Sequence, residues 1–463
     1  MTDLLTGSPA KRMCAFCGPL LIGNLFQQFY SMADSIVVSQ VMGTEAFAAV
    51  SSTGAVNFLV IGFVQGMCSG CAIPISQDFG AGDRKGVKRA LGACVWLGLL
   101  MTLIMSVAMY FFTDDLLRLL NTKEELFDYA YSYIHVIFVG MFTTMLYNLL
   151  ASILRALGDS KTPLYFLIVA CLLNIGLDIL FVAAFKMGVA GAAYATLLAQ
   201  LISGVLCFIT IRKRFPDLNL KKQDLRYDSE YMRRLFSYGV PMGLQFSITA
   251  IGSVVVQAAV NELDVNAIAA MGAGGKVSNF VTCPLDSLGI AVATFVGQNY
   301  GAGRLDRIRQ GLKQMTVVGL FYCVFAFLMC LFFGKFMTGL IGITDDEVLS
   351  LSQHFLSIFS LFYPALLIIY VFRNAVQGLG YSREAMLSGL FELVGRAAVA
   401  FGFIGRFGFE AACFASPVAW MAADVLLLCL YKRKMGDLWR WQLARERVEK
   451  MRAEADAKKR LSE

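Results

Sequence analysis

Long apolar stretches alternate with short polar connections along almost the whole chain. A helix needs about 20 apolar residues to cross the hydrocarbon layer of a membrane, and the chain contains twelve such stretches. They are residues 14–39, 46–74, 90–112, 128–154, 163–185, 189–211, 238–261, 267–296, 314–337, 350–372, 385–404 and 409–431. The pattern predicts an all-α polytopic membrane protein with twelve transmembrane helices.

The connections carry opposite charge on the two sides of the predicted membrane. Most Lys and Arg residues fall in every second connection and at the two ends of the chain, whereas the other connections are acidic, as in "TDD" at 113–115 and 344–346. Basic connections stay on the cytoplasmic side. We therefore expect a multi-pass protein of the plasma membrane, the inner membrane of a bacterial cell, with both termini in the cytoplasm.

The composition favours lipid as the main partner of the chain. Of 463 residues, 57% are hydrophobic and 16% are charged, and the mean hydropathy is +0.64. This is more apolar surface than a soluble core buries. The net charge of +7 reflects membrane orientation, because no soluble basic domain is present to bind nucleic acid. Motifs such as HExxH or Walker A are absent, so we expect neither an enzyme nor a bound cofactor or resident metal.

The chain contains an internal repeat. "DFGAGDRKGVKRALGACVWLG" at 78–98 returns as "NYGAGRLDRIRQGLKQMTVVG" at 299–319, and other segments recur at nearly the same offset of about 221 residues. Six spans therefore repeat as six spans in the same orientation, which predicts two pseudo-symmetric six-helix lobes. We expect an N-terminal lobe over 1–211, a cytoplasmic linker over 212–236, a C-terminal lobe over 237–431 and a basic cytoplasmic tail over 432–463. The repeated loop is either a short glycine-rich connector or part of a gate.

Several segments resemble the multidrug and toxic compound extrusion family of cation-coupled exporters. These are "GPLLIGNLFQQFYSMADSIVVSQVMG", "QDFGAGD", "LRALGDSKTPLYFLIVACLLNIGLDILFV" and "GQNYGAGRLDRI", and the resemblance extends to about Tyr431. It implies alternating access between two lobes. It also implies a monomer that exports amphipathic small molecules in exchange for Na⁺ or H⁺.

Two carboxylates inside the predicted spans are candidates for ion coupling. Asp34 and Asp178 are costly in a membrane unless they face an interior cavity. Asn174 lies one helical turn before Asp178 on the same face, and Thr196 adds a hydroxyl. Such oxygens suit a transiently bound small cation, or a proton when no cation is bound. In the resembled family, the branch similar to DNA-damage-inducible protein F carries its cation site at positions that match these four. The alternative is that the polar groups only pack helices together.

The second lobe lacks this set, because Asn174 aligns with Arg396 and Asp178 with Ala400. It carries Lys276, Glu392 and Arg396 instead. Glu392 and Arg396 are spaced for an ion pair within one helix, and the group either is structural or lines the cleft and recognises an anionic group. A further set that could line the cleft consists of Gln27, Gln28 and Tyr30.

Two transport functions remain open from the sequence. The first is a secondary active antiporter that exports amphipathic organic compounds. The second is a flippase for lipids or lipid-linked oligosaccharides of similar architecture, which would need a strongly cationic cavity. The acidic pair in the first lobe favours the antiporter.

Overall fold

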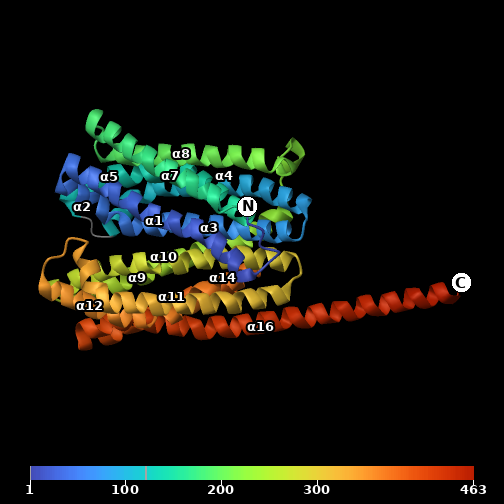
Figure 1. Cartoon of the computed structure of the whole chain (residues 1–463). Coiled ribbons are helices and arrows are strands. Elements are labelled where there is room, and N and C mark those ends of the chain that lie inside the picture. The colour runs from blue at the N-terminus through green and yellow to red at the C-terminus, as the bar shows by residue number, and fades with distance from the viewer. Residues whose placement is uncertain (1, 120–122, 463) are drawn as a thin grey trace.

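The computed structural model describes residues 2–119 and 123–462; the side chains at 29–37, 39, 44, 47, 55, 445–446 and 448–462 are not among those described. Within these residues the chain is a bundle of long helices (Figure 1). The first half of the chain forms α1 (Pro9–Met42), α2 (Thr44–Ser52), α3 (Gly54–Gly80), α4 (Arg84–Leu119), α5 (Glu124–Val139), α6 (Met141–Ala156), α7 (Lys161–Asp178), η1 (Ile179–Ala184) and α8 (Val189–Arg214).

The second half repeats this order after two short 3₁₀ turns, η2 (Pro216–Leu218) and η3 (Lys222–Leu225). Its elements are α9 (Ser229–Val260), α10 (Val265–Gly301), α11 (Leu305–Gly339), α12 (Asp346–Leu361), α13 (Tyr363–Ile368), η4 (Ile369–Arg373), α14 (Asn374–Gly378), α15 (Ser382–Val399), η5 (Ala400–Ile404) and α16 (Gly405–Ser462). In Figure 1 the blue-to-green helices form one lobe and the yellow-to-red helices the other.

The twelve predicted spans all fall on helices. Among the described residues, eight continuous helices are long and apolar enough to cross a membrane, and two bent pairs, α5 with α6 and α12 with α13 and α14, raise this to ten. The long segment Ser382–Ala444 holds two predicted spans, because Gly408 interrupts its helical backbone with a φ of 57°. The remaining predicted span lies in α1. The fold is the predicted all-helical bundle with two lobes.

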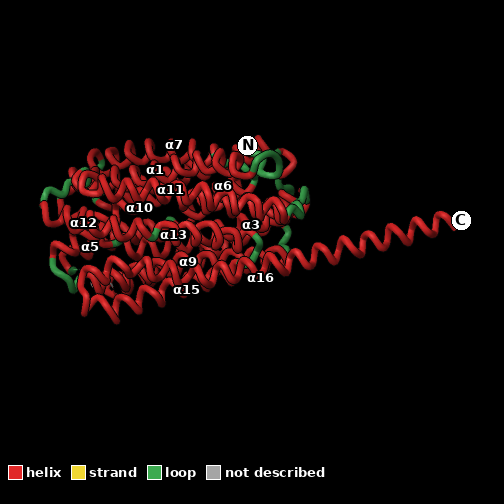
Figure 2. The backbone as a smooth tube through the Cα atoms, turned by 60° about the horizontal axis from the view of Figure 1, so that its bottom comes forward, coloured by secondary structure: helices red, strands yellow, loops and turns green. Residues whose placement is uncertain are grey.

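Connections between the helices gather at the two ends of the bundle (Figure 2). We call the end where α1 begins and α3 ends the basal end, and the opposite one the distal end. The last part of α16 leaves the basal end as a single helix that extends well beyond the bundle (Figure 1).

Each lobe has its own hydrophobic core. Each core also includes residues near the start of a helix from the other half of the sequence. Met13 and Phe16 of α1 are buried in the core of the second lobe. Tyr231 and Leu235 of α9 are buried in the core of the first lobe. Apolar burial therefore holds the two lobes together at the basal end, in addition to their separate cores.

Two π-helical segments sit at equivalent positions of the repeat. Asp178 is the last residue of α7 before η1, and η5 begins at Ala400, 222 residues later. Such segments are rare, and they are frequent at functional sites. Both lobes thus break their regular helix at the point where the sequence places polar residues in a membrane span.

Candidate functional site

The candidate ion ligands Asn174, Asp178 and Thr196 meet inside the first lobe. Asn174 and Asp178 are fully buried, and Thr196 is 9% exposed. The Asn174 side chain forms two hydrogen bonds when its amide nitrogen faces Asp178. Its Nδ2 then donates to Asp178 Oδ2 at 3.0 Å, and its Oδ1 accepts from the Thr196 backbone N–H at 3.2 Å. The helical turn between positions 174 and 178 stacks these groups, as the spacing predicts.

A polar cavity lies about one helical turn away from this group, toward the basal end. Its free volume is about 80 Å³, enough for a few water molecules. Five of the six spans of the first lobe contribute to the wall of the cavity, through α1, α3, α6, α7 and α8. The polar lining residues are Gln27, Gln65, Thr144, Tyr147, Asn148, Gln200 and Ser203. The Thr144 hydroxyl donates to Gln200 Oε1 at 2.6 Å. The buried candidate ligands are therefore next to space that can hold water.

The other predicted residues of α1 are placed in part. Asp34 and Tyr30 lie outside the residues whose side chains are described. Gln27 lines the polar cavity, and Gln28 is exposed. The structure thus brings together three of the four predicted ion ligands and adds one of the predicted cleft residues to the cavity beside them.

Glu392 in the second lobe is held between two arginines. Its Oε2 lies 3.5 Å from Arg396 Nη2, the ion pair that the i, i+4 spacing allows, and its Oε1 forms an ion pair with Arg373 of η4. Arg396 Nη1 also donates to the Thr249 backbone carbonyl at 3.3 Å. Lys276, in contrast, is exposed on α10, so the structure does not join it to the other two predicted residues.

Sequence reasoning missed three charged side chains inside the bundle. Asp286 of α10 accepts a hydrogen bond from Asn24 Nδ2 of α1 at 3.0 Å. Asp424 of α16 is buried, and its Oδ1 has no hydrogen-bond partner among the described residues. Both lie in predicted apolar spans, the same signal that identified Asp178. Arg373 follows its predicted span by one residue, so that only the structure could place it inside.

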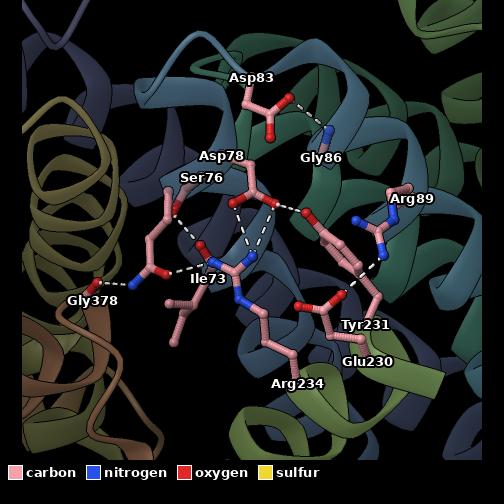
Figure 3. Close-up of polar contacts among 11 residues, drawn as sticks. Ile73, Ser76, Asp78, Asp83, Gly86, Arg89, Glu230, Tyr231, Arg234 and Gly378 are labelled. Atoms are coloured by element: carbon pink, nitrogen blue, oxygen red, sulfur yellow. Dashed lines mark hydrogen bonds and ion pairs between the residues drawn. The ribbon is translucent and has the colours of Figure 1, made fainter. Parts of the chain in front are cut away.

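The two lobes are fastened to each other at the basal end (Figure 3). Asp78 at the end of α3 accepts from Arg234 Nη1 of α9 at 2.9 Å and from the Tyr231 hydroxyl at 3.2 Å. Gln77 Nε2 donates to the Gly378 backbone carbonyl of the second lobe at 2.9 Å. Asp78 begins the first copy of the repeated segment and Gln77 directly precedes it, so both lie just before its loop.

The second copy makes the equivalent contacts in the opposite direction. Gln298, which aligns with Gln77, donates to the Ala156 backbone carbonyl at 2.8 Å, and Ala156 aligns with Gly378. Asn299, which aligns with Asp78, donates to the Leu4 backbone carbonyl at 3.2 Å. We call the contacts of these two copies the basal seal. They show why the segment occurs twice: each copy fastens its own lobe to the other.

Two glycines allow the backbones to approach within the basal seal. A Cβ at Gly80 would lie 2.0 Å from the Gln298 carbonyl oxygen, and one at Gly301 would lie 1.8 Å from the Gln77 carbonyl oxygen. No side chain fits at either position without separating the helices. The glycines thus serve the lobe interface as well as the turn that follows.

The chain is similar to known transporters over most of its length. The chain is 28% identical to the probable multidrug resistance protein YpnP of Bacillus subtilis, over 84% of this chain and 86% of that protein. It is 26% identical to the FAD transporter of Shewanella oneidensis, over 81% and 84% of the two chains. A crystal structure of MATE in the bent conformation superposes with a TM-score of 0.87 at 22% identity, covering 94% of this chain and 98% of that one.

The family match reproduces the repeat seen in the structure. The MatE family profile matches the chain twice, over residues 19–180 and 241–401. The two matches begin 222 residues apart, and each covers most of the first five spans of one lobe. By this match over both lobes, the chain belongs to the MatE family, the multidrug and toxic compound extrusion transporters.

Proposed function

We propose that the protein is a secondary active exporter that exchanges Na⁺ or H⁺ for amphipathic organic compounds by alternating access. It acts as a monomer in the plasma membrane, without a resident cofactor, and the basal end faces the cytoplasm. The positive side chains at that end, including those of Arg12, Arg84 and Arg234, support this orientation.

One observation carries the proposal: a fully buried carboxylate, Asp178, sits with an amide and a hydroxyl in the first lobe beside a polar cavity. Ionisable groups within the membrane most often serve ion or proton movement. A cation that enters this site moves down the membrane potential, which supplies about 2.3 kcal/mol per charge per 100 mV. That energy drives export if binding favours one arrangement of the lobes over the other.

The basal seal supports alternating access. It joins the two lobes at the end proposed to be cytoplasmic. Export requires the seal to open and close in each cycle. No single feature of the described residues favours lipid flipping over this function.

The test is uptake of tetraphenylphosphonium into inverted membrane vesicles with an imposed Na⁺ or H⁺ gradient. Wild-type protein should accumulate the cation with at least one of the gradients, and Asp178→Asn should abolish the response. Asp424→Asn is the matched control, because it makes the same change in a buried carboxylate of the other lobe. If Asp178→Asn responds to both gradients as the wild type does, coupling does not occur at this site.

A further inference from the structure

The segment that precedes α1, residues 2–8, lies at the basal end and is bound to the second lobe. The Leu4 side chain is fully buried in the core of that lobe. Arg307, near the start of α11, holds the backbone of the segment. Its Nη2 donates to the carbonyls of Leu4 at 3.2 Å and Thr6 at 3.0 Å, and its Nη1 donates to that of Gly7 at 2.6 Å. A guanidinium can bind several carbonyls at once because its N–H groups form a fixed fork. We call residues 2–8 the basal strap.

The basal strap also reaches the first lobe and the basal seal. The Thr2 backbone N–H donates at 2.9 Å to the carbonyl of Gly158, in the loop that follows α6. A Cβ at Gly158 would lie 2.9 Å from the Thr2 carbonyl oxygen, so the two backbones pass close together. Asn299 of the basal seal donates to the carbonyl of Leu4, whose side chain anchors the strap. The strap is therefore a further connection between the lobes, beside the two glutamines of the seal.

A local turn shapes the basal strap. Asp3 Oδ1 accepts from the Leu5 backbone N–H at 2.8 Å, and its Oδ2 accepts from the Thr6 hydroxyl. An Asp side chain that bonds the backbone two residues on closes such a turn within one short segment. Gly7 has a φ of 74°, which glycine adopts without steric cost. Arg304 Nη1 donates to the Leu5 carbonyl of this turn at 2.5 Å. The strap thus presents successive carbonyls to the arginines at the start of α11.

These two arginines belong to only one copy of the repeated segment. Arg304 and Arg307 of the second copy align with Asp83 and Gly86 of the first. Both loops make the same turn, because the glycine directly before these positions has a φ of 74° in the first copy and 70° in the second. The turn therefore does not require the arginines. Their side chains serve the basal strap instead.

Export by alternating access requires the lobes to separate at the basal end, so the strap must leave one of them. The buried Leu4 side chain and the charge-assisted hydrogen bonds of the arginines attach it to the second lobe, whereas the hydrogen bond from Thr2 to Gly158 attaches it to the first. We propose that the basal strap is a clasp that moves with the second lobe and releases Gly158 when the basal seal opens. While it bridges the lobes, it favours the joined arrangement, because it contacts both lobes only there. This inference rests on the proposed export function and adds a control of its conformational equilibrium.

The test is hydrogen–deuterium exchange of the purified full-length protein in nanodiscs, without substrate or ion gradient. Arg307→Gln removes the bonds that hold the strap. It should speed exchange about five-fold at the basal ends of α3 and α10 and at residues 157–162 of the first lobe, the effect of one hydrogen bond between the lobes. Arg309→Gln is the matched control, because this exposed arginine of the same helix forms no hydrogen bond or ion pair among the described residues. Exchange in this control should match the wild type.

A second variant acts on the strap from its other partner. Leu4→Ala shortens the buried anchor without altering α11 and should give the same pattern of faster exchange, so that the test does not depend on the folding of Arg307→Gln. Exchange that rises only within residues 2–8 would overturn the proposal, because the strap would then not influence the seal. Equal exchange in Arg307→Gln and Arg309→Gln would overturn it as well.

Transport separates the clasp from the export function. In inverted vesicles, whose outer face is the proposed cytoplasmic side, Arg307→Gln should lower the half-saturating concentration of tetraphenylphosphonium by up to about five-fold, because a larger fraction of the protein is open on that side. An unchanged concentration together with faster exchange would contradict control of access by the strap. If the exchange pattern is found but the wild type transports nothing with either gradient, the export proposal fails and the clasp between the lobes stands.

Discussion

The two lobes share one fold but place opposite chemistry at the same point of the repeat. In the first lobe, α7 reaches its π-helical segment with Asn174 and Asp178, an amide and a carboxylate. In the second, α15 reaches the equivalent segment with Arg396 in the place of Asn174, and Glu392 lies between Arg396 and Arg373. The first-lobe group offers side-chain oxygens, with the Asn174 amide donating to Asp178, whereas Glu392 in the second lobe is paired with two arginines.

This difference is the basis for proposing ion exchange in the first lobe and not in the second. Oxygen ligands around one carboxylate can accept Na⁺ or a proton from outside. A carboxylate bonded to two arginines is already neutralised by the chain itself. The comparison supports coupling in the first lobe and a structural role for the second cluster. The predictions below test this contrast, beginning with the variant expected to lose the most stability.

The largest effect should come from Glu392→Gln. It leaves Arg373 and Arg396 buried without their shared counter-ion, which typically costs about 3 to 5 kcal/mol. Asp178→Asn should instead leave stability close to wild type while it abolishes coupling. The test compares the denaturation midpoints of the two purified variants with that of the wild type. If Asp178→Asn unfolds as readily as Glu392→Gln, the first-lobe group is structural too, and the contrast between the lobes is lost.

A smaller effect is expected at the basal seal, where the lobes are alike. Gly301→Val and Gly80→Val should each force the lobes apart there, at a cost of about 1 to 3 kcal/mol, and reduce transport by about ten-fold. Hydrogen–deuterium exchange at the ends of α3 and α10 should rise. Gly275→Val on α10 is the control, because a Cβ at this position meets nothing within 4 Å. Faster exchange in Gly301→Val alone would show that the seal is not symmetric.

The smallest effect should come from the two glutamines of the seal. Gln298→Leu removes one hydrogen bond between the lobes, worth about 1 kcal/mol. Gln77→Leu should cost somewhat more, because Gln77 Oε1 also accepts from Arg234 Nη2 at 3.0 Å. The same exchange experiment, with transport measured in parallel, ranks the two variants. A larger effect for Gln298→Leu would contradict the bonding seen at the basal end.

Much of the first-lobe site was predictable from sequence because its signals are local. The four-residue spacing of Asn174 and Asp178 fixes their common face, and a carboxylate in an apolar span predicts an interior position. The same signal was present at Asp286 and Asp424. The surroundings of these two residues come from distant parts of the chain, as Asn24 of α1 does for Asp286, and spacing along one helix does not reveal them.

The repeated segment shows the limit of sequence reasoning most directly. Its glycines and positive charges are compatible with a short connector as well as with part of a gate. The connector interpretation explains the turn but not the contacts between the lobes. The contacts of Gln77 with Gly378 and of Gln298 with Ala156 join residues 301 and 142 positions apart. No local pattern encodes such pairs.

By itself, the sequence determined the twelve apolar spans, their pairing into two six-helix halves and the presence of costly charge inside them. These properties follow from lengths and periodicities that the backbone imposes on any chain in lipid. Only the tertiary structure decided which charges neutralise one another and which residues join the two lobes at the basal end. Those outcomes depend on the approach of side chains from different helices, and electrostatic and hydrogen-bond energies change steeply with that distance.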